Sequence, residues 1–291
     1  MQYIDKSVHR EEGNRITLQY LEDIKIEDEQ RYPVDYNNSF RILPKKENSY
    51  YKQMVSVLLM NQRNYCCYCM RRLTGVGDTT LEHIIPQSSN TDRIKYYQRD
   101  EVPELKNQIV LSGDFSHTIN PLLEKLPHTV AYDNLVASCH GELPKIEHID
   151  DAVIHDGQCC NNARGNEDIY PIFLLNIPNL IIYHKSGQAL EGNEEQWNED
   201  VRKVILNTRL NYESLRDIRR LWFVLKDNSI EEINRLGDNK DTRRDLIRDA
   251  LYLTSLEQKD IDNLLIKFQK EEYWNTFLLY DWFHSADWDE A

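Results

Sequence analysis

The chain has 291 residues, enough for one large domain or two smaller ones. Hydrophobic residues make up 40% and charged residues 29% of it, which excludes a disordered or collagen-like chain and indicates a folded protein. The 35 Lys and Arg against 49 Asp and Glu leave a net charge of -14. Such a charge repels a phosphate backbone and argues against a protein that binds nucleic acid unaided.

The cysteine content and the N-terminal residues indicate a reducing compartment. Six Cys are far fewer than a disulfide scaffold needs, and Met1–Arg10 lacks the layout of a secretory signal, so we expect a cytoplasmic protein. The most apolar run, residues 172–183, is too short to span a bilayer and contains Pro178, so no membrane span is expected. Reduced cysteines become candidate metal ligands.

The predicted elements fall into three consecutive segments. Residues 1–48 are polar and rich in turn signals, and we expect an irregular lead-in. Residues 49–186 begin with an amphipathic helix over 49–63, capped by Ser49, and continue into short β-like runs at 80–85 and 107–111. Residues 195–291 lack Pro and repeat apolar residues at helical spacing, which predicts an all-α C-terminal domain of at least three helices.

The six cysteines lie in two clusters. Cys66 and Cys69 form a C-x-x-C pair, whose two thiolates can reach one ion at about 2.3 Å. Cys139 and Cys160 are the other candidate ligands, separated by a long insertion. Four thiolates leave zinc no open position for water, so this pattern predicts a zinc ion that stabilises the fold and does not catalyse.

The choice of these four ligands leaves alternatives. Cys67, Cys159 and His140 are close substitutes in sequence for the chosen cysteines. All six cysteines could also be small buried hydrophobic residues without a metal. The polar residues between the two clusters argue against that interpretation.

A second group of polar residues lies within this frame. Glu82 and His83 are adjacent at the end of a β-like run, Asn134 precedes Cys139, and Asn161 follows Cys160. An oxygen ligand beside a nitrogen base suits a magnesium ion and a water molecule that must lose a proton. A Glu-His pair by itself is more often a packing feature, so its weight comes from its position between the cysteine pairs.

These motifs resemble the HNH endonucleases, whose ββα-metal finger is often bracketed by zinc-binding cysteine pairs. The matching residues are Cys66 and Cys69, Glu82-His83-Ile84-Ile85-Pro86, Asn134-Leu135, and Cys160-Asn161 with Arg164-Gly165. The resemblance implies an α+β fold: an HNH finger with a four-cysteine zinc site, followed by the all-α domain.

The resemblance also implies a role for each matching residue. His83 corresponds to the general base, and Glu82 and Asn161 correspond to ligands of a catalytic Mg²⁺ or Mn²⁺. Asn134 corresponds to the middle Asn, which ties the hairpin loop to the histidine strand, and Arg164 corresponds to a phosphate contact.

The chain departs from the family pattern in three ways. Glu82 stands where Asp is commoner, and Asn161 stands where the family has its last His. Magnesium still accepts an amide oxygen, so this change does not exclude activity. The segment between His83 and Asn134 is long and holds two alternative ligands, His117 and His128.

Three short phrases outside the finger resemble a narrower group, the PtuB-like HNH proteins encoded beside an ATPase in Septu and some retron anti-phage systems. They are residues 3–6, residues 64–69, and residues 205–211 with the arginines that follow. The resemblance implies an ATPase partner in a defence complex.

The segment from Arg202 to Lys226 is locally basic, with seven basic residues against two acidic ones, Glu213 and Asp217. If it forms one helix, four arginines fall on one stripe, which predicts contacts with nucleic acid or an acidic partner surface. A solvated helix edge is the alternative. The four are Arg202, Arg209, Arg216 and Arg220.

The last stretch, residues 260–284, is rich in Trp, Tyr and Phe. Aromatic residues of this kind are usually buried in a core, and they are also enriched at protein interfaces. Docking of a partner on this region is therefore a second hypothesis beside a core role.

The leading interpretation is a metal-dependent HNH endonuclease that hydrolyses phosphodiester bonds in DNA, with RNA as the alternative substrate. A non-catalytic, zinc-stabilised binding or scaffold subunit is the main alternative. A redox or catalytic-thiol site is less favoured, because no base is placed to activate a thiolate. The sequence does not specify the cleavage site, the activation trigger or the stoichiometry of a complex.

Overall fold

The computed structural model describes residues 1–25, 33–115, 125–143, 158–235, 239–252 and 257–289. It is a mixed α+β structure with small sheets. The chain forms two compact units: one comprises residues 1–67, 73–140 and 165–178, and the other comprises 68–72, 141–164 and 179–291. These units interleave along the sequence, whereas the predicted domains are consecutive segments.

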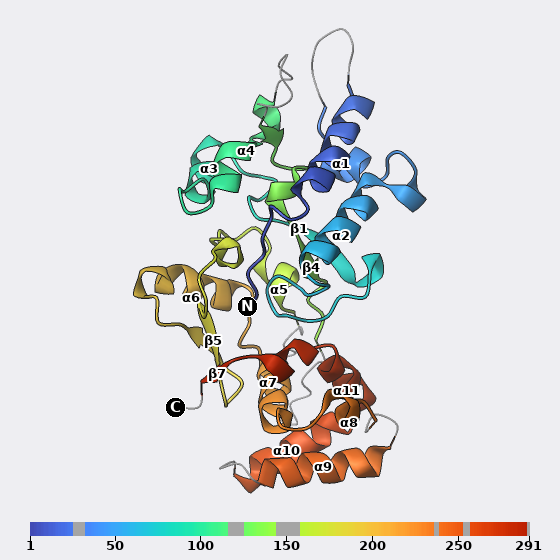
Figure 1. The fold of residues 1–291 in the computed structure, drawn as a ribbon, viewed down its shortest axis with the longest axis vertical. Coiled ribbons are helices and arrows are strands. Elements are labelled where there is room, and N and C mark those ends of the chain that lie inside the picture. The colour runs from blue at the N-terminus through green and yellow to red at the C-terminus, as the bar shows by residue number, and fades with distance from the viewer. Residues whose placement is uncertain (26–32, 116–124, 144–157, 236–238, 253–256, 290–291) are drawn as a thin grey trace, which may run out of the picture. The chain divides into compact units, whose positions relative to one another are not determined.

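Among its described residues, the first unit contains a two-stranded antiparallel sheet and the α-helices α1 to α4 (Figure 1). Strand β1 pairs with β4, so that Glu82 lies opposite Val136 and His83 opposite Leu135. Two short strands, β2 and β3, pair in parallel. The elements are α1 (Arg10–Asp23), α2 (Tyr50–Asn61), β1 (Thr79–His83), α3 (Thr91–Tyr97), α4 (Pro103–Gln108), β2 (Ile109–Val110), β3 (Leu126–Pro127) and β4 (Leu135–Cys139).

Helix α2 confirms the predicted amphipathic helix. The Ser49 side chain accepts a hydrogen bond from the Lys52 amide at 3.4 Å and caps the first turn. Met54, Val55 and Leu58 are buried, and the helix packs on β1 and β4. The buried side chains of α2 and the β1–β4 pair therefore share one hydrophobic core.

Helix α1 contradicts the expectation of an irregular segment over residues 1–48. Its buried side contains Ile16, Tyr20 and Leu21 together with Gly13 and Thr17. Because only three of these five residues are apolar, the helical pattern is weak in the sequence. Gly13 is required by packing: a Cβ there would lie 2.2 Å from the Tyr132 ring.

The second unit contains most of the remaining helices and a three-stranded sheet in the order β6-β5-β7 (Figure 1). Strand β7 lies in the region predicted to be all-α and pairs in parallel with β5. The elements are α5 (Cys160–Arg164), β5 (Ile181–His184), β6 (Ala189–Glu191), α6 (Asn198–Asn207), α7 (Glu213–Leu225), α8 (Ile230–Arg235), α9 (Lys240–Tyr252), α10 (Gln258–Phe268), α11 (Glu271–Leu278) and β7 (Trp288–Asp289).

The aromatic residues of the C-terminal stretch form the core of this unit. The rings of Trp222 and Phe277 stack with centroids 4.3 Å apart, and the Trp222 indole donates a hydrogen bond to the Phe277 carbonyl at 3.1 Å. Trp274 and Phe268 are also buried. The stretch is divided between α10, α11 and a 3-10 helix at Asp281–Ser285, and burial of its Phe268, Trp274 and Phe277 rings supports the core interpretation.

Candidate functional site

The Sγ atoms of Cys66, Cys69, Cys139 and Cys160 all lie within 4.8 Å of one another. All four side chains are buried, and their spacing suits one metal ion such as zinc, whose tetrahedral thiolates lie about 3.8 Å apart at bonds of about 2.3 Å. These are the four cysteines chosen from the sequence. The alternatives, Cys67, Cys159 and His140, are not members of this group.

The backbone around Cys66 and Cys69 turns tightly. Met70, which follows Cys69, has a φ of 63°, in the left-handed region that reverses the chain. The Cys139 amide donates a hydrogen bond to the Cys66 sulfur at 3.3 Å, and the Tyr280 hydroxyl donates one to the Cys69 sulfur at 3.6 Å. Such donors stabilise a thiolate, the form that binds a metal.

A second tight turn, at Gly141, lies between Cys139 and Cys160. This glycine has a φ of +75°, and a Cβ there would lie only 2.0 Å from the Cys159 carbonyl oxygen. The Cys159 amide in turn donates a hydrogen bond to the Gly141 carbonyl at 2.8 Å. Cys160 itself has a φ of 53°. Glycine is therefore the residue that permits this close approach.

Glu82 and His83 lie at the end of β1 and are 5% and 7% exposed. The His83 Nε2 atom lies 2.9 Å from the Thr129 carbonyl oxygen. Because a carbonyl only accepts, Nε2 carries a proton, and in the neutral ring Nδ1 keeps its lone pair. The Gln87 amide nitrogen lies 3.4 Å from Nδ1, and the Tyr36 ring packs edge-on at 4.6 Å between centroids.

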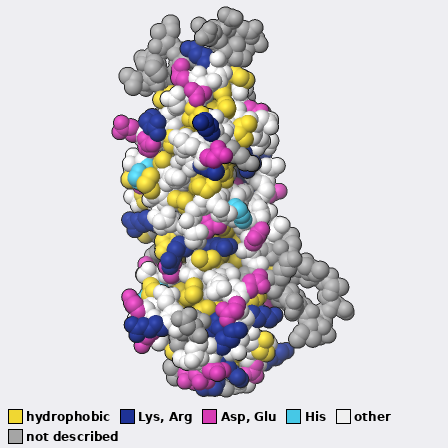
Figure 2. Space-filling view, turned by 90° about the vertical axis from the view of Figure 1, so that its right-hand side faces the viewer, with side chains coloured by type: hydrophobic (Ala, Val, Ile, Leu, Met, Phe, Trp, Pro, Cys, Tyr) yellow, Lys and Arg dark blue, Asp and Glu magenta, His cyan; other side chains and the backbone are white. Residues whose placement is uncertain are grey.

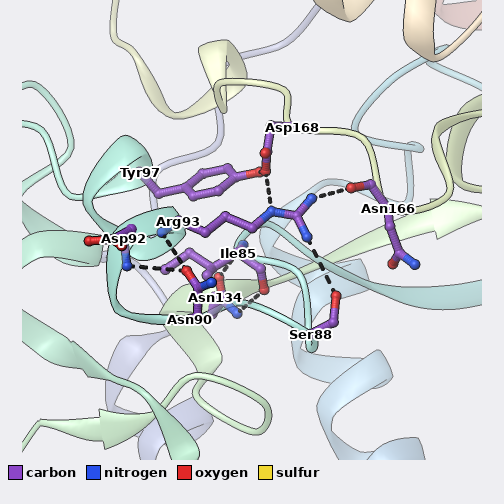
Figure 3. A network of polar contacts seen from close by, with 9 residues as sticks. All are labelled: Ile85, Ser88, Asn90, Asp92, Arg93, Tyr97, Asn134, Asn166 and Asp168. Carbon is purple, nitrogen blue, oxygen red and sulfur yellow. Dashed lines mark hydrogen bonds and ion pairs between the residues drawn. The ribbon is translucent and has the colours of Figure 1, made fainter.

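Asn134 connects two segments of the first unit (Figure 3). Its Oδ1 accepts a hydrogen bond from the Ile85 amide at 2.7 Å, and its Nδ2 donates to the carbonyls of Ile85 and His128 at 3.0 and 2.6 Å. Its backbone carbonyl accepts from the Ile84 amide at 2.9 Å. Asn134 thereby fixes the two residues that follow His83.

Lys6 is buried beside Asn134, and the sequence gives no signal that it supports the candidate site. Its buried Nζ donates to the carbonyls of Tyr132, at 3.0 Å, and Leu135, which flank Asn134. Burial lowers the pKa of Lys6 to about 7. Burial also raises the pKa of Asp133, whose carboxylate accepts a hydrogen bond from Arg10 at 3.1 Å. Neither contact has a local sequence signal, because both are long-range.

Arg93 of α3 anchors the insertion between β1 and β4 (Figure 3). Its Nε donates to Asp168 at 2.7 Å, and its guanidinium also contacts the Asn166 carbonyl. Tyr97 donates to the same Asp168 oxygen at 2.6 Å. Two donors on one carboxylate hold α3 against residues 166–168.

The two other predicted site residues lie on α5. Asn161 is half-buried, and Arg164 is only 2% exposed. The Arg164 guanidinium donates a hydrogen bond to the Tyr68 hydroxyl at 3.1 Å, inside the C-x-x-C turn. A phosphate contact would need this side chain to reach a ligand, so that role stays a prediction.

Of the two alternative histidines, His128 lies among the described residues. His128 is buried, its Nδ1 accepts from the Ser112 amide at 3.0 Å, and burial lowers its pKa. His117 lies outside the described residues. Both ring nitrogens of His128 lie near polar atoms of the first unit, because Nε2 is 3.3 Å from the Gln87 carbonyl oxygen.

The basic segment is not one helix, so the single stripe predicted for Arg202, Arg209, Arg216 and Arg220 is wrong. Helix α6 ends at Asn207, α7 begins at Glu213, and Arg209 has a φ of 51° in the turn between them. Arg202 forms an ion pair with Glu191 at 2.8 Å. Only Arg216 and Arg220 share a helix.

The surface drawn in Figure 2 has no continuous basic area, because Lys and Arg alternate with Asp and Glu. A face of mixed charge agrees with the overall charge of -14. None of the described helices is long and apolar enough to cross a membrane.

The comparisons with known proteins give no family for this chain. No family model matches it, and neither a curated protein nor a solved structure is significantly similar.

Proposed function

We propose that this protein is a metal-dependent endonuclease of the HNH type, which hydrolyses phosphodiester bonds in DNA, with RNA as the alternative substrate. The observation that carries the proposal is the setting of His83. It lies at the end of β1 with Nε2 2.9 Å from a carbonyl oxygen, which supports Nδ1 as the proton acceptor. Asn134 accepts hydrogen bonds from the amides of Ile84 and Ile85, the two residues that follow His83.

In this mechanism His83 accepts a proton from the attacking water through Nδ1. Thr129 keeps the ring in the required tautomer, and Asn134 restricts the movement of the strand end. Glu82 and Asn161 would hold Mg²⁺ or Mn²⁺ through oxygen atoms, the donors that these ions prefer. Such an ion supplies neutralisation of the charge that develops on the phosphate.

The cysteine group has a separate role in the proposal. Four buried sulfur atoms suit zinc, which would stabilise the fold and leave no site for water. The pairing of β1 with β4, followed in sequence by α5, agrees with the ββα order of the HNH finger. The zinc site and the hydrolytic site therefore use different ligands.

The cellular role rests on the sequence resemblance. Three short phrases support a PtuB-like effector of an anti-phage complex with an ATPase, acting in the cytoplasm. A partner that delivers the substrate would offset the net charge of -14, which disfavours unaided binding.

A non-catalytic, zinc-stabilised scaffold of such a complex is the second candidate. The buried guanidinium of Arg164 favours it, because that side chain contacts Tyr68 instead of facing solvent. The two candidates differ in whether His83 is needed for hydrolysis.

The test is cleavage of plasmid DNA and of RNA by the purified protein, with and without the ATPase, in Mg²⁺ or Mn²⁺. We expect His83→Ala to lower the cleavage rate by at least about 100-fold, since a general base typically accelerates a reaction by about 10²–10⁴-fold. His184→Ala, in the second unit, is the matched control and should cleave normally. Equal cleavage by His83→Ala would refute the mechanism, and no cleavage under any condition would favour the scaffold.

A further inference from the structure

The second unit contains a polar cavity of about 290 Å³ between α7, α10 and the β5–β6 turn. This volume is near the lower end of the range of about 300–1,000 Å³ that small-molecule sites occupy. Six charged side chains line it: Arg216, Arg220, Lys267, Glu213, Asp217 and Asp260. Neither the cysteine group nor His83 contributes to it.

Two of the three carboxylates in the cavity already have a cation. The Lys267 Nζ lies 2.6 Å from Glu213 and 2.6 Å from Asp217. Burial disfavours the charged form of Lys267, yet the two carboxylates outweigh this effect and raise its pKa. This triad accounts for Lys267, and its one cation against two carboxylates leaves a net charge of -1.

The two guanidinium groups have no such partner. Among the described residues, neither Arg216 nor Arg220 forms an ion pair, although Arg220 is near enough to Asp217 to favour its charged form. The Nε of Arg216 is buried and has no hydrogen-bond partner. A buried donor without an acceptor is costly, so an anion in the cavity would stabilise this arrangement.

The backbone holds the two arginines in place. Arg216 and Arg220 are four residues apart on α7, so they lie on the same side of the helix. The turn between β5 and β6 packs directly on α7: a Cβ on Gly187 would lie 2.0 Å from the Arg216 carbonyl oxygen. The β5–β6 turn is therefore held against the α7 backbone at this side of the cavity.

We propose that this cavity binds a small phosphomonoester, with Arg216 and Arg220 on the phosphate and Asp260 accepting a hydrogen bond from a hydroxyl or amine of the same ligand. Two guanidinium groups match the charge of about -2 on a phosphomonoester better than the single charge of a carboxylate or a phosphodiester. The planar guanidinium also forms paired hydrogen bonds to phosphate oxygens. This site is independent of the proposed nuclease chemistry.

The test uses the full chain and three probes at constant ionic strength: inorganic phosphate, AMP and adenosine. We expect AMP and phosphate to bind, by calorimetry, and to raise the melting temperature, because a ligand of the folded state stabilises it. Adenosine lacks the phosphate and should do neither. Absence of binding by AMP and phosphate up to about 10 mM, or equal binding by adenosine, would overturn the proposal.

Substitutions assign the binding to this cavity. Arg216→Ala and Arg220→Ala should each weaken AMP binding at least about tenfold, as expected for a charge-assisted hydrogen bond. Arg202→Ala removes the same charge outside the cavity and should bind AMP normally. Asn263→Trp, at an exposed position of the rim, should block binding without loss of a charge. Normal AMP binding by both cavity arginine variants would refute the site.

A fourth probe identifies the source of the phosphate. A 5′-phosphorylated oligonucleotide that competes with AMP would assign the cavity to nucleic-acid ends, and one that does not would assign it to free nucleotides. Both results keep the phosphomonoester as the ligand, whereas equal competition by an unphosphorylated oligonucleotide would contradict it.

Discussion

Lys6 shows how a single buried charge supports the candidate site. Its ammonium group donates to the carbonyls on both sides of Asn134, and its Nζ lies 4.1 Å from the centroid of the Tyr132 ring. Burial makes the charged form costly and lowers the pKa to about 7. The folded protein therefore binds this proton less tightly than the unfolded chain.

This difference predicts a pH dependence of stability. Between the folded pKa of about 7 and the unfolded value of 10.5, the unfolded chain holds the proton and the folded chain does not. The free energy of unfolding should therefore rise with pH across this window, by about 2 kcal/mol between about pH 7 and 9, and this gain is lost as pH falls. Urea unfolding at both pH values measures it.

Lys6→Met removes the titrating group and should abolish that rise. Lys95→Met, at an exposed position of α3, is the matched control and should keep it. An equal rise in the Lys6→Met variant would show that another group is responsible.

At the scale of elements, two tight turns determine the cysteine group. The C-x-x-C spacing predicted the first turn, which reverses at Met70, and Gly141 permits the second. Because the pairs lie far apart in the sequence, long-range contacts bring them together, and the Cys67 amide donates a hydrogen bond at 3.1 Å to the carbonyl of Ala137, two residues before Cys139.

We expect the purified protein to contain about one zinc ion per chain. Cys69→Ser should lose the metal and lower the melting temperature by on the order of 10 °C, because structural zinc contributes much of the folding free energy of such sites. Cys67→Ser, two residues away and outside the group, should keep the zinc ion and the melting temperature of the unmodified protein. Metal analysis and thermal unfolding measure the difference, and equal zinc content in the two variants would contradict the ligand set.

Some of these elements could be predicted from the sequence alone. Helix α2 and the strand with Glu82 and His83 were predicted, because a capping Ser, an apolar spacing and a β-like run are local signals. Helix α1 was missed because its buried side includes Gly13 and Thr17. The break between α6 and α7 was missed because neither Gly nor Pro marks it.

At the scale of the molecule, the charge of -14 limits how nucleic acid can bind. Arg202 is paired with Glu191, and Arg164 contacts Tyr68, so these two predicted phosphate contacts are already engaged within the protein. The sequence showed the total charge and could not show these pairings, because they depend on contacts between distant residues.

This arrangement predicts weak DNA binding with a shallow salt dependence. With about 0.9 counterions released per phosphate contact, the slope of log K against log salt should lie between about -1 and -3 for the protein alone. Fluorescence anisotropy over a salt series measures it. A slope as steep as that of a protein with many phosphate contacts would mean that an unrecognised basic surface exists.

The contact between Gly13 and Tyr132 limits how far the chain can be shortened from its N-terminus. The N-terminal residues reach the loop that holds Asn134 at several points: Gly13 lies against Tyr132, and Thr17 donates to the Val130 carbonyl at 2.9 Å. The predicted nuclease domain starts at Ser49. A fragment that begins there would lack the residues that cover this loop, and Asp133 would become exposed. A shorter fragment that keeps this loop covered would therefore have to retain α1 and the residues before it.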